Sequence, residues 1–330
     1  MRGRNSWLPG LALVLVFALL SGCATPPQTQ ALRSAVQADL PRQVELRNTP
    51  FIAQERYQCG PAALAMSLRA AGFAVDAEAL VPQVYTPKRE GSLQVEMLAA
   101  GRRNGALSMK LAPRLDALLA ELAAGTPVLI LQNLSLPIAP RWHYAVVVGY
   151  DLDRGDIILR SGLTERLVMR MSTFEHTWAR SAYWAMVTVP PGSFPKTVTE
   201  AAAVEALVAY EKNSPPAAAR QAYAAGARRW PGNMALALGL GNTAYAAGDR
   251  AAAADAYQRA TVLHPDSGAA FNNLAVTLME LGRLPEARVA AEKAVALGGQ
   301  WRAAAMDTLA SIEGAEKKRP SPVSPPSKQL

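Results

Sequence analysis

Hydrophobic positions form three differently patterned stretches along the chain. A continuous apolar run fills residues 11–20, directly after a basic start. Residues 50–189 mix β-branched runs with helix-like apolar spacing, whereas residues 199–315 are rich in alanine and have helical spacing throughout. Proline and glycine punctuate the border between these two stretches. The pattern predicts an α+β domain at residues 49–191, followed by an all-α domain at residues 192–315.

The start of the chain predicts export and lipidation. A basic head, a short apolar run and small residues are typical of a secretory signal, here residues 1–22. The sequence Leu20-Ser21-Gly22-Cys23 resembles a bacterial lipobox, in which Cys23 is lipidated and becomes the new N-terminus. In the alternative, an ordinary signal peptide, Cys23 has no role. By resemblance to enterobacterial sorting, Ala24 favours the periplasmic face of the outer membrane, which predicts a lipid-anchored protein of the cell envelope.

Two further segments are predicted to lie outside the domains. Residues 23–48 are polar and interrupted by proline, which is typical of a tether. Residues 316–330 form a basic tail rich in proline and serine, and we expect this tail to be disordered.

Composition and charge exclude several classes of protein. The 330 residues are 50% hydrophobic and 18% charged, so disorder throughout is excluded. Much of the formal charge of +8 falls in the signal segment and in the tail, and the body carries no basic face interleaved with aromatic residues. Three scattered histidines and two cysteines do not make a metal-ligand set. We therefore expect no nucleic-acid partner, no metal and no cofactor.

Cys59 is the first candidate catalytic residue. Gly60 and Pro61 lead into a run of good helix formers that ends at Gly72. Proline suits the first helical turn because its missing N–H would have no partner there. A thiol at a helix N-terminus is stabilised as thiolate by the positive end of the helix dipole. Cys59 is therefore a candidate nucleophile, although a lone cysteine before a helix is also common as a buried core thiol.

His143 is the candidate base among three histidines. It opens the β-branched run 144–149, which predicts the start of a buried strand, and the turn at 153–156 predicts that the next strand returns as a hairpin. His176 lies on a short amphipathic segment and is predicted to be a surface residue, and His264 lies far away in the helical stretch. A cysteine on a helix that faces a histidine on a sheet is the papain layout.

The residues around Cys59 and His143 resemble one peptidase family. Gln54 precedes the first segment, and the two segments read Cys59-Gly60-Pro61-Ala62-Ala63-Leu64 and His143-Tyr144-Ala145-Val146-Val147-Val148-Gly149-Tyr150. They are similar to the bacteriocin-processing peptidases of double-glycine leaders, which are papain-like and best known as the N-terminal domain of peptide-exporting ABC transporters. The stretches 90–100 and 125–130 add to the likeness, which covers about residues 50–189. No Gly-rich Walker sequence occurs, so no ATPase is expected.

The resemblance implies roles for four residues and departs from the family at two of them. Cys59 would be the nucleophile, His143 the general base and Gln54 the oxyanion-hole side chain. Gln54 stands five residues before the cysteine, whereas the family has about six, so Gln58 is the alternative donor. The family has an aspartate where Ser161 stands. A serine can orient the imidazole but supplies no negative charge. Asp151 and Asp153, closer to His143 in the sequence, are expected in the hairpin loop, exposed to solvent.

The alanine-rich stretch repeats with a period of 34 residues. Gly248 and Gly282 are one period apart, as are Pro231 and Pro265. This period is typical of tetratricopeptide repeats, in which helices pair antiparallel. Tyr223, one period before a matching tyrosine, marks a degenerate earlier repeat from about Thr199, and residues 301–312 would form a capping helix. Such repeats commonly bind peptides or proteins in a concave groove. Asn242, Asn272 and Asn273 are suited to hold a peptide backbone there, but equally to cap helices.

Three hypotheses of function follow. The leading one is a membrane-anchored cysteine peptidase whose repeats recruit the peptide or protein substrate, or a partner protein. The alternative is a catalytically weak or inactive adaptor lipoprotein with the peptidase fold, suggested by the missing aspartate and the added repeats. The third is acyl transfer on the same fold, with an amine in place of water.

Overall fold

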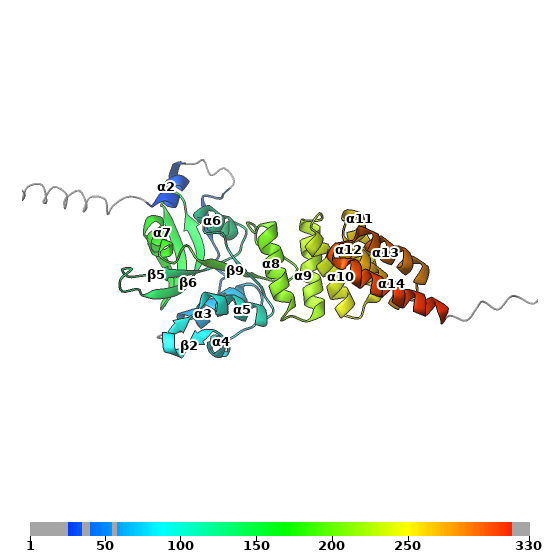
Figure 1. Ribbon diagram of the computed structural model, residues 1–330. Helices are drawn as coiled ribbons and strands as arrows, with labels where there is room; N and C mark the ends of the chain where they lie inside the picture. Colours follow the sequence, from blue (N-terminus) through cyan, green and yellow to red (C-terminus); the bar gives the residue numbers. More distant parts are fainter. Residues whose placement is uncertain (1–25, 35–39, 55–57, 319–330) are drawn as a thin grey trace, which may run out of the picture. The chain divides into compact units, whose positions relative to one another are not determined.

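The computed structural model describes residues 26–34, 40–54 and 58–318. Within these residues the chain divides into two compact units. The first comprises the residues up to Met97 together with Lys110–Val187, and the second comprises Leu98–Met109 together with the chain from Thr188 onward. The first unit carries most of a β-sheet, and the second is largely helical (Figure 1).

An antiparallel sheet forms the framework of the first unit. The strands run in the order β4-β9-β5-β6-β7-β8, and β1 also pairs with β6. These strands are β1 (Gln43–Glu45), β4 (Leu107–Lys110), β5 (Val128–Asn133), β6 (Trp142–Asp151), β7 (Asp156–Ser161), β8 (Thr164–Arg170) and β9 (Ala185–Val189). A separate small hairpin pairs β2 (Tyr85–Thr86) with β3 (Gly91–Ser92). The predicted hairpin after His143 is confirmed, because β6 turns into β7 at residues 152–155.

Helices cover both faces of this sheet. In Figure 1, α3 lies on one side of β5 and β6, while α6 and α7 lie on the other. The helices of this part of the chain are α2 (Pro27–Ser34), α3 (Cys59–Ala70), α4 (Ala77–Val84), the short 3-10 helix Pro87–Arg89, α5 (Gln94–Arg103), α6 (Leu115–Ala123) and α7 (Met171–Ala179). The α+β class predicted for this domain is confirmed.

Helix α3 is the central helix of the first unit. Every residue from Gly60 to Leu68 is buried, which is the pattern of a helix enclosed on all sides. The helix starts at Cys59 and ends before Gly72, whose backbone takes a positive φ of 90°. Both ends agree with the prediction from the sequence, and the start places Cys59 at the N-terminus of a buried helix.

The described part of residues 23–48, predicted as a tether, is folded against the first unit. The N–H groups of Gln28 and Thr29, at the start of α2, donate to the carboxylate of Glu175 on α7 at 2.9 and 2.6 Å. Thr29 also donates through its hydroxyl, at 2.6 Å. Glu175 is fully buried, and a buried carboxylate is costly unless it accepts such hydrogen bonds. These bonds fix α2 on α7.

The second unit is a series of antiparallel helix pairs, as the 34-residue period predicts. Its helices are α8 (Glu200–Glu211), α9 (Pro216–Arg229), α10 (Met234–Ala246), α11 (Arg250–Leu263), α12 (Gly268–Glu280), α13 (Leu284–Leu297), the 3-10 helix Gly299–Trp301 and α14 (Arg302–Lys317). Gly248 and Gly282 follow the first helix of their pairs at φ of 81° and 73°. The pair α8–α9 is the predicted degenerate repeat, and α14 is the predicted final helix.

Glycines in α10 allow the two neighbouring helices, α9 and α11, to pack closely. A Cβ added to Gly239 would lie 2.1 Å from the ring of Tyr223, and one added to Gly241 would lie 2.4 Å from the ring of Tyr257. Both tyrosine rings are buried. A small residue opposite a tyrosine ring is therefore repeated on both sides of α10.

Among the described residues, no helix has the length and apolar content needed to cross a bilayer.

Candidate active site

Cys59 lies at the first turn of α3 and is a free thiol. Burial raises the pKa of the thiol, while the backbone N–H groups of Tyr144, Gly60 and Cys59 itself act in the opposite direction. These N–H groups are suited to stabilise negative charge on sulfur, as expected at a helix N-terminus. Because burial outweighs them, the pKa of the thiol lies above its usual range, which favours the protonated form over the thiolate.

The backbone of Tyr144, on β6, contacts both Cys59 and Gln54. Strand β7 pairs with β6 only from Val146 onward, so the residues of β6 before Val146 have no strand partner on that side. The C=O of Tyr144 accepts a hydrogen bond of 3.5 Å from Nε2 of Gln54, and its N–H faces Cys59. The N–H of Gln54 donates to Gly162 at 3.1 Å. Gln54 and Cys59 therefore both contact the backbone of Tyr144, near the end of the pairing between β6 and β7.

His143 and Ser161 meet at the same end of the sheet. Nε2 of His143, the second residue of β6, lies 2.9 Å from Oγ of Ser161, the last residue of β7. The contact occupies one ring nitrogen and leaves Nδ1 as the other proton-carrying position. Ser161 thus has the geometry of a residue that orients the imidazole.

The electrostatic surroundings of His143 keep it neutral. Burial lowers the pKa of the imidazole, and the nearby Arg141 guanidinium lowers it further. No carboxylate of the described residues contributes to this shift. A protonated Cys59 thiol and a neutral His143 imidazole differ from the thiolate–imidazolium pair that a negatively charged third residue would stabilise.

The two alternative carboxylates lie at the other end of β6. Asp151 accepts hydrogen bonds from Gln43 at 3.0 Å and from the N–H of Arg154 at 2.9 Å, and Asp153 accepts from Arg42 at 2.9 Å. Strand β6 has ten residues, and His143 is at its beginning whereas Asp151 is its last residue. Neither aspartate can orient the imidazole.

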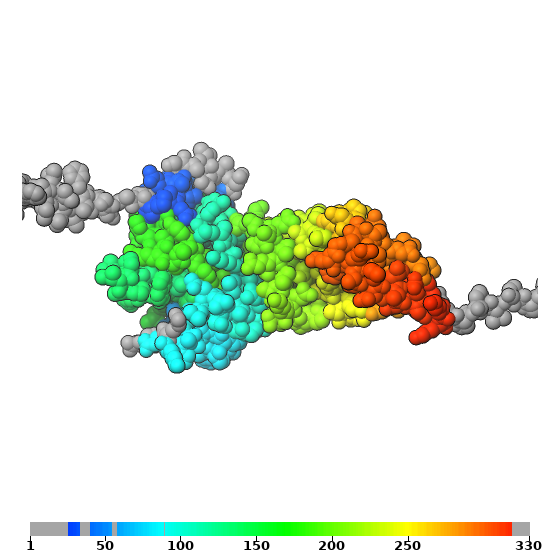
Figure 2. All heavy atoms as spheres, in the orientation of Figure 1, coloured from blue at the N-terminus to red at the C-terminus, as the bar shows by residue number. Residues whose placement is uncertain are grey.

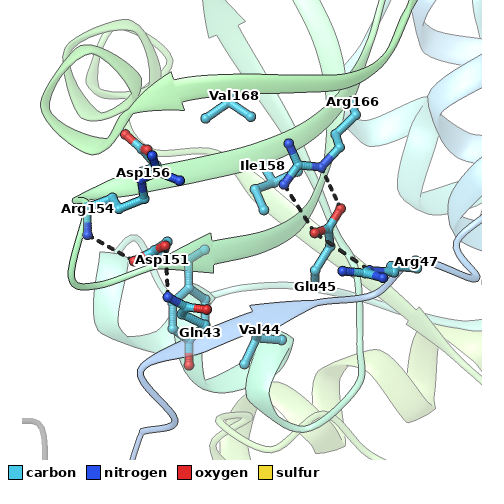
Figure 3. Close-up of a pocket in the computed structure, with 11 residues that line it drawn as sticks. Gln43, Val44, Glu45, Arg47, Asp151, Arg154, Asp156, Ile158, Arg166 and Val168 are labelled. Atoms are coloured by element: carbon cyan, nitrogen blue, oxygen red, sulfur yellow. Dashed lines mark hydrogen bonds and ion pairs between the residues drawn. The ribbon is translucent and has the colours of Figure 1, made fainter.

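A polar cavity of about 320 Å³ lies beside Asp151, on β1, β6, β7 and β8 (Figure 3). Two of its three carboxylates form ion pairs, Glu45 with Arg166 at 2.8 Å and Asp156 with Arg170 at 3.1 Å. The Arg166 guanidinium lowers the pKa of Glu45, so this pair stays charged at neutral pH. The cavity is a solvated, charge-balanced surface away from His143.

Sequence reasoning missed two residues that hold this site. The hydroxyl of Tyr144 donates to the C=O of Ser92 at 3.0 Å, which ties β6 to β3. Oγ of Ser92 packs against Gly60, because a Cβ on that glycine would lie 2.2 Å from it. The short stretch around Ser92 carried part of the family resemblance, but it gave no indication of this contact.

Arg160 is a third residue without a predicted role. It is buried next to Ser161 and donates to three backbone carbonyls, those of Glu165 at 2.6 Å, Arg47 at 3.1 Å and Thr49 at 3.3 Å. These bonds hold the end of β7 and the segment that leads to Gln54. A charged residue within the apolar strand 157–161 was a signal that could have identified it.

The structure also describes two of the other residues singled out from the sequence, Gln58 and His176. Gln58 is the residue before α3, and its C=O accepts from Ala62 at 3.1 Å. His176 is exposed, as predicted. Cys23 and the whole signal segment lie outside the described residues, as does most of the tail. The described residues contain no group of three or more histidine, cysteine or acidic side chains arranged to hold a metal ion.

A second candidate site lies among the helical repeats. A cavity of about 310 Å³ is lined by Asn242, Tyr245, Tyr257, Asn273, Val276 and Thr277. Oδ1 of Asn242 accepts a hydrogen bond from the Tyr257 hydroxyl at 2.7 Å and another from Nδ2 of Asn273 at 3.4 Å. Asn272, by contrast, is buried and accepts from Thr308 at 2.9 Å, so its role is structural. Of the three asparagines considered from the sequence, two line the cavity.

Comparisons with known proteins agree with this division. Residues 46–186 match the Peptidase_C39-like family, and residues 238–305 match a tetratricopeptide repeat family. No curated protein matches the chain.

Solved structures similar to each part have low sequence identity. A putative C39-like peptidase from Bacillus anthracis is 20% identical, covers 47% of this chain and 100% of its own, and has a TM-score of 0.39. The first tetratricopeptide domain of RPAP3 bound to an HSP90 peptide is 20% identical over 36% of this chain and 93% of its own, with a TM-score of 0.34.

A third similar structure is the Yersinia enterocolitica type III secretion chaperone SycD in complex with a peptide of the translocator YopD. It is 16% identical over 37% of this chain and 98% of its own, with a TM-score of 0.34. The family matches and the observed elements lead to one conclusion: the chain combines an N-terminal α+β Peptidase_C39-like domain with an all-helical tetratricopeptide repeat region.

Proposed function

We propose that the Peptidase_C39-like domain is an active cysteine peptidase, with Cys59 as the nucleophile and His143 as the general base. The proposal rests on the contact between His143 and Ser161. This contact lies at the end of the sheet where Cys59 and Gln54 contact the backbone of Tyr144. A helix-borne thiol, a histidine and an orienting group in one place are what acyl transfer by a thiol requires.

The first chemical step starts from a neutral pair. The Nε2–H of His143 donates to Oγ of Ser161, which leaves Nδ1 unprotonated and able to accept the thiol proton. Sγ of Cys59 attacks the substrate carbonyl as Nδ1 takes that proton, and the tetrahedral oxyanion forms. The Cys59 N–H and Nε2 of Gln54 donate to the oxyanion. The 3.5 Å bond of Gln54 to Tyr144 is long enough to be exchanged for a shorter one to the oxyanion.

The second step releases the products. The imidazolium of His143 returns its proton to the leaving amine, and the thioester remains on Cys59. Water then attacks the thioester while Nδ1 accepts a proton, and the thiol is restored. An amine in place of water would give acyl transfer instead. Because Ser161 cannot stabilise the imidazolium by charge, we expect a slower enzyme than one with a carboxylate at this position.

The tetratricopeptide repeats would recruit the substrate or a partner protein. Two of the similar structures are peptide complexes: the first tetratricopeptide domain of RPAP3 is bound to an HSP90 peptide, and SycD is in complex with a peptide of YopD. The cavity lined by Asn242 and Asn273 offers amide groups for a peptide backbone, and Tyr245 adds an aromatic wall. The substrate type that the resemblance implies is a peptide with a double-glycine cleavage site.

The lipobox resemblance supports anchoring of the mature chain at the periplasmic face of the outer membrane through a lipid on Cys23. Several acyl chains, at about 0.8 kcal/mol for each buried methylene, would hold the protein firmly on a bilayer. Metabolic labelling with a fatty acid tests this part: the label should be incorporated by the wild type and lost in Cys23→Ser.

Cleavage of a proteome-derived peptide library tests the peptidase directly. The wild type is expected to produce new peptide termini, detected by mass spectrometry, that Cys59→Ala does not produce. New peptide bonds rather than new termini would identify acyl transfer. Absence of both kinds of product, with the fold intact by circular dichroism, would contradict the proposal and leave the adaptor hypothesis.

A further inference from the structure

The connection between β5 and β6 presents apolar side chains to solvent. Leu136 is 61% exposed, Ile138 is 91% exposed and Trp142 is 51% exposed. Leu134 is also exposed, and two prolines stand among these residues. In Figure 2 this hairpin projects from the edge of the first unit. Residues 134–142, called the apolar tip below, therefore expose more hydrophobic surface than folding requires.

A second exposed leucine lies at the same end of the sheet. Leu163, in the turn between β7 and β8, is 80% exposed. Strand β6 begins where β7 ends, and the His143–Ser161 contact joins these two ends. The apolar tip and Leu163 are thus next to the candidate catalytic residues, on two adjacent hairpins.

The shape of this surface distinguishes between its possible occupants. Sites that bind peptides or small molecules are concave and cover their apolar side chains in part even when empty. Ile138 and Leu163, which are almost fully exposed, project from the surface instead. Projecting apolar side chains fit into a soft, extended apolar phase, such as the boundary of a lipid bilayer.

The charges and the tryptophan favour the same occupant. Residues 133–143 contain no acidic residue but include Arg141 and Trp142. Arg180, which is exposed, donates to the carbonyls of Asn133 and Ser135 at 3.0 and 2.8 Å, and so adds a second positive charge at the base of the tip. Tryptophan is enriched at membrane interfaces, and arginine is attracted to anionic lipid headgroups.

The described start of the chain lies close to this surface. Helix α2 begins at Pro27 and is bound through its first N–H groups to Glu175 on α7. Arg180, which holds the tip, follows directly after the end of α7. Figure 1 shows α7 between α2 and β5. Five residues along a helix span about 7.5 Å, so the start of the described chain and the base of the tip are held by neighbouring turns of α7.

We propose that the apolar tip, together with Leu163, inserts into the surface of an anionic phospholipid bilayer and holds the catalytic end of the domain against it. The proposed lipid on Cys23 supports this placement, because the three residues up to Pro26 reach only about 10 Å. The insertion itself depends on the side chains of the tip and does not depend on the lipid.

Vesicle flotation with the chain from residue 24 onward tests the proposal without the anchor and without loss of any described residue. Wild-type protein is expected to float with vesicles of phosphatidylcholine and phosphatidylglycerol and to bind vesicles of phosphatidylcholine alone more weakly. The double variant Leu136→Ser, Ile138→Ser should lose at least about tenfold in binding, because two exposed aliphatic side chains no longer enter the apolar phase. Trp142→Phe should abolish the vesicle-induced blue shift of tryptophan emission.

The matched control is the double variant Val262→Ser, Val289→Ser, which changes two side chains of the helical unit with similar exposure, 72% and 67%. It should bind vesicles as the wild type does. Failure of the wild type to float, equal binding by the tip variant, or equal loss in the control variant would each overturn the proposal. A tip variant that floats normally but cleaves peptides less well would identify the tip as a peptide-binding surface instead. Peptide cleavage by Cys59 is measured separately, so failure of membrane insertion leaves the proposed catalysis intact.

Discussion

The two units differ in how their close contacts are made. In the helical unit, glycines of α10 lie against the rings of Tyr223 and Tyr257, and one of these rings also bonds to Asn242. Around Cys59, a glycine faces a serine whose Oγ is buried without a partner in the described structure, and Oε1 of Gln54 is likewise buried without one. In the helical unit, Nε2 of His264 is also buried without a partner among the described residues. The two units therefore differ in what faces their close-packed glycines: an aromatic ring in the repeats and a polar side chain next to Cys59.

The largest expected effect comes from removing the base. His143→Ala should lower peptide cleavage by about 10²- to 10⁴-fold, because it removes the group that accepts the thiol proton in the proposed mechanism. His176→Ala, which removes an exposed histidine of the same unit, serves as the control and should leave the rate unchanged. Equal rates in the wild type and in His143→Ala would show that the site does not work as a nucleophile and base.

Adding one methyl group in each unit tests the comparison itself. Gly241→Ala should destabilise the helical unit by about 1–3 kcal/mol, because the tyrosine ring leaves no room for the new Cβ. Gly60→Ala should instead lower cleavage, because the Cβ would lie 2.2 Å from Oγ and 2.7 Å from Cβ of Ser92 and would displace the turn that carries Cys59. Hydrogen exchange measures the first effect and cleavage measures the second.

Two controls accompany these glycine variants. Gly232→Ala has open space around the new Cβ and should be close to neutral in both measurements. The double variant Gly60→Ala, Ser92→Gly should recover much of the lost cleavage, because it removes the clashing side chain. If Gly60→Ala alone cleaves peptides normally, the contact with Ser92 does not position the nucleophile.

The smallest expected change concerns Ser161. Ser161→Ala should lower cleavage about fivefold, since one hydrogen bond to the imidazole is worth about 1 kcal/mol. Ser161→Asp should raise the pKa of His143 and increase cleavage at neutral pH by about tenfold or more, because a carboxylate stabilises the imidazolium. A loss of activity in Ser161→Asp would mean that the site depends on a neutral pair and cannot use the charged form.

The sequence predicted the fold more fully than the site. The 34-residue period and the glycines at its fixed positions are local signals, and they gave the helix ends near Gly248 and Gly282. The motif around Cys59 likewise gave the start of α3. The pKa of Cys59 is raised by burial, and the pKa of His143 is lowered by burial and by Arg141. These shifts favour a neutral pair, whereas the sequence predicted a thiolate at the helix N-terminus.

The contacts that escaped prediction are those made through the backbone. Tyr144 binds Gln54 through its C=O and faces Cys59 with its N–H, and every residue type offers these same groups. The folding of α2 onto α7 depends on Glu175, which is 146 residues away from Thr29 in the chain. Such pairings leave no periodic pattern for a sequence to show.

The pH dependence of Cys59 alkylation by iodoacetamide tests most directly whether Cys59 and His143 act together from a neutral resting state. With the chain from residue 24 onward, Cys59 is the only thiol. Because burial raises the pKa of the thiol, alkylation should increase through an apparent pKa above about 8.5, the ordinary value for cysteine, and His143→Ala should slow it near neutral pH. An apparent pKa well below 7 that is lost in His143→Ala would contradict the neutral pair, and alkylation indifferent to His143 at every pH would contradict the catalytic assignment.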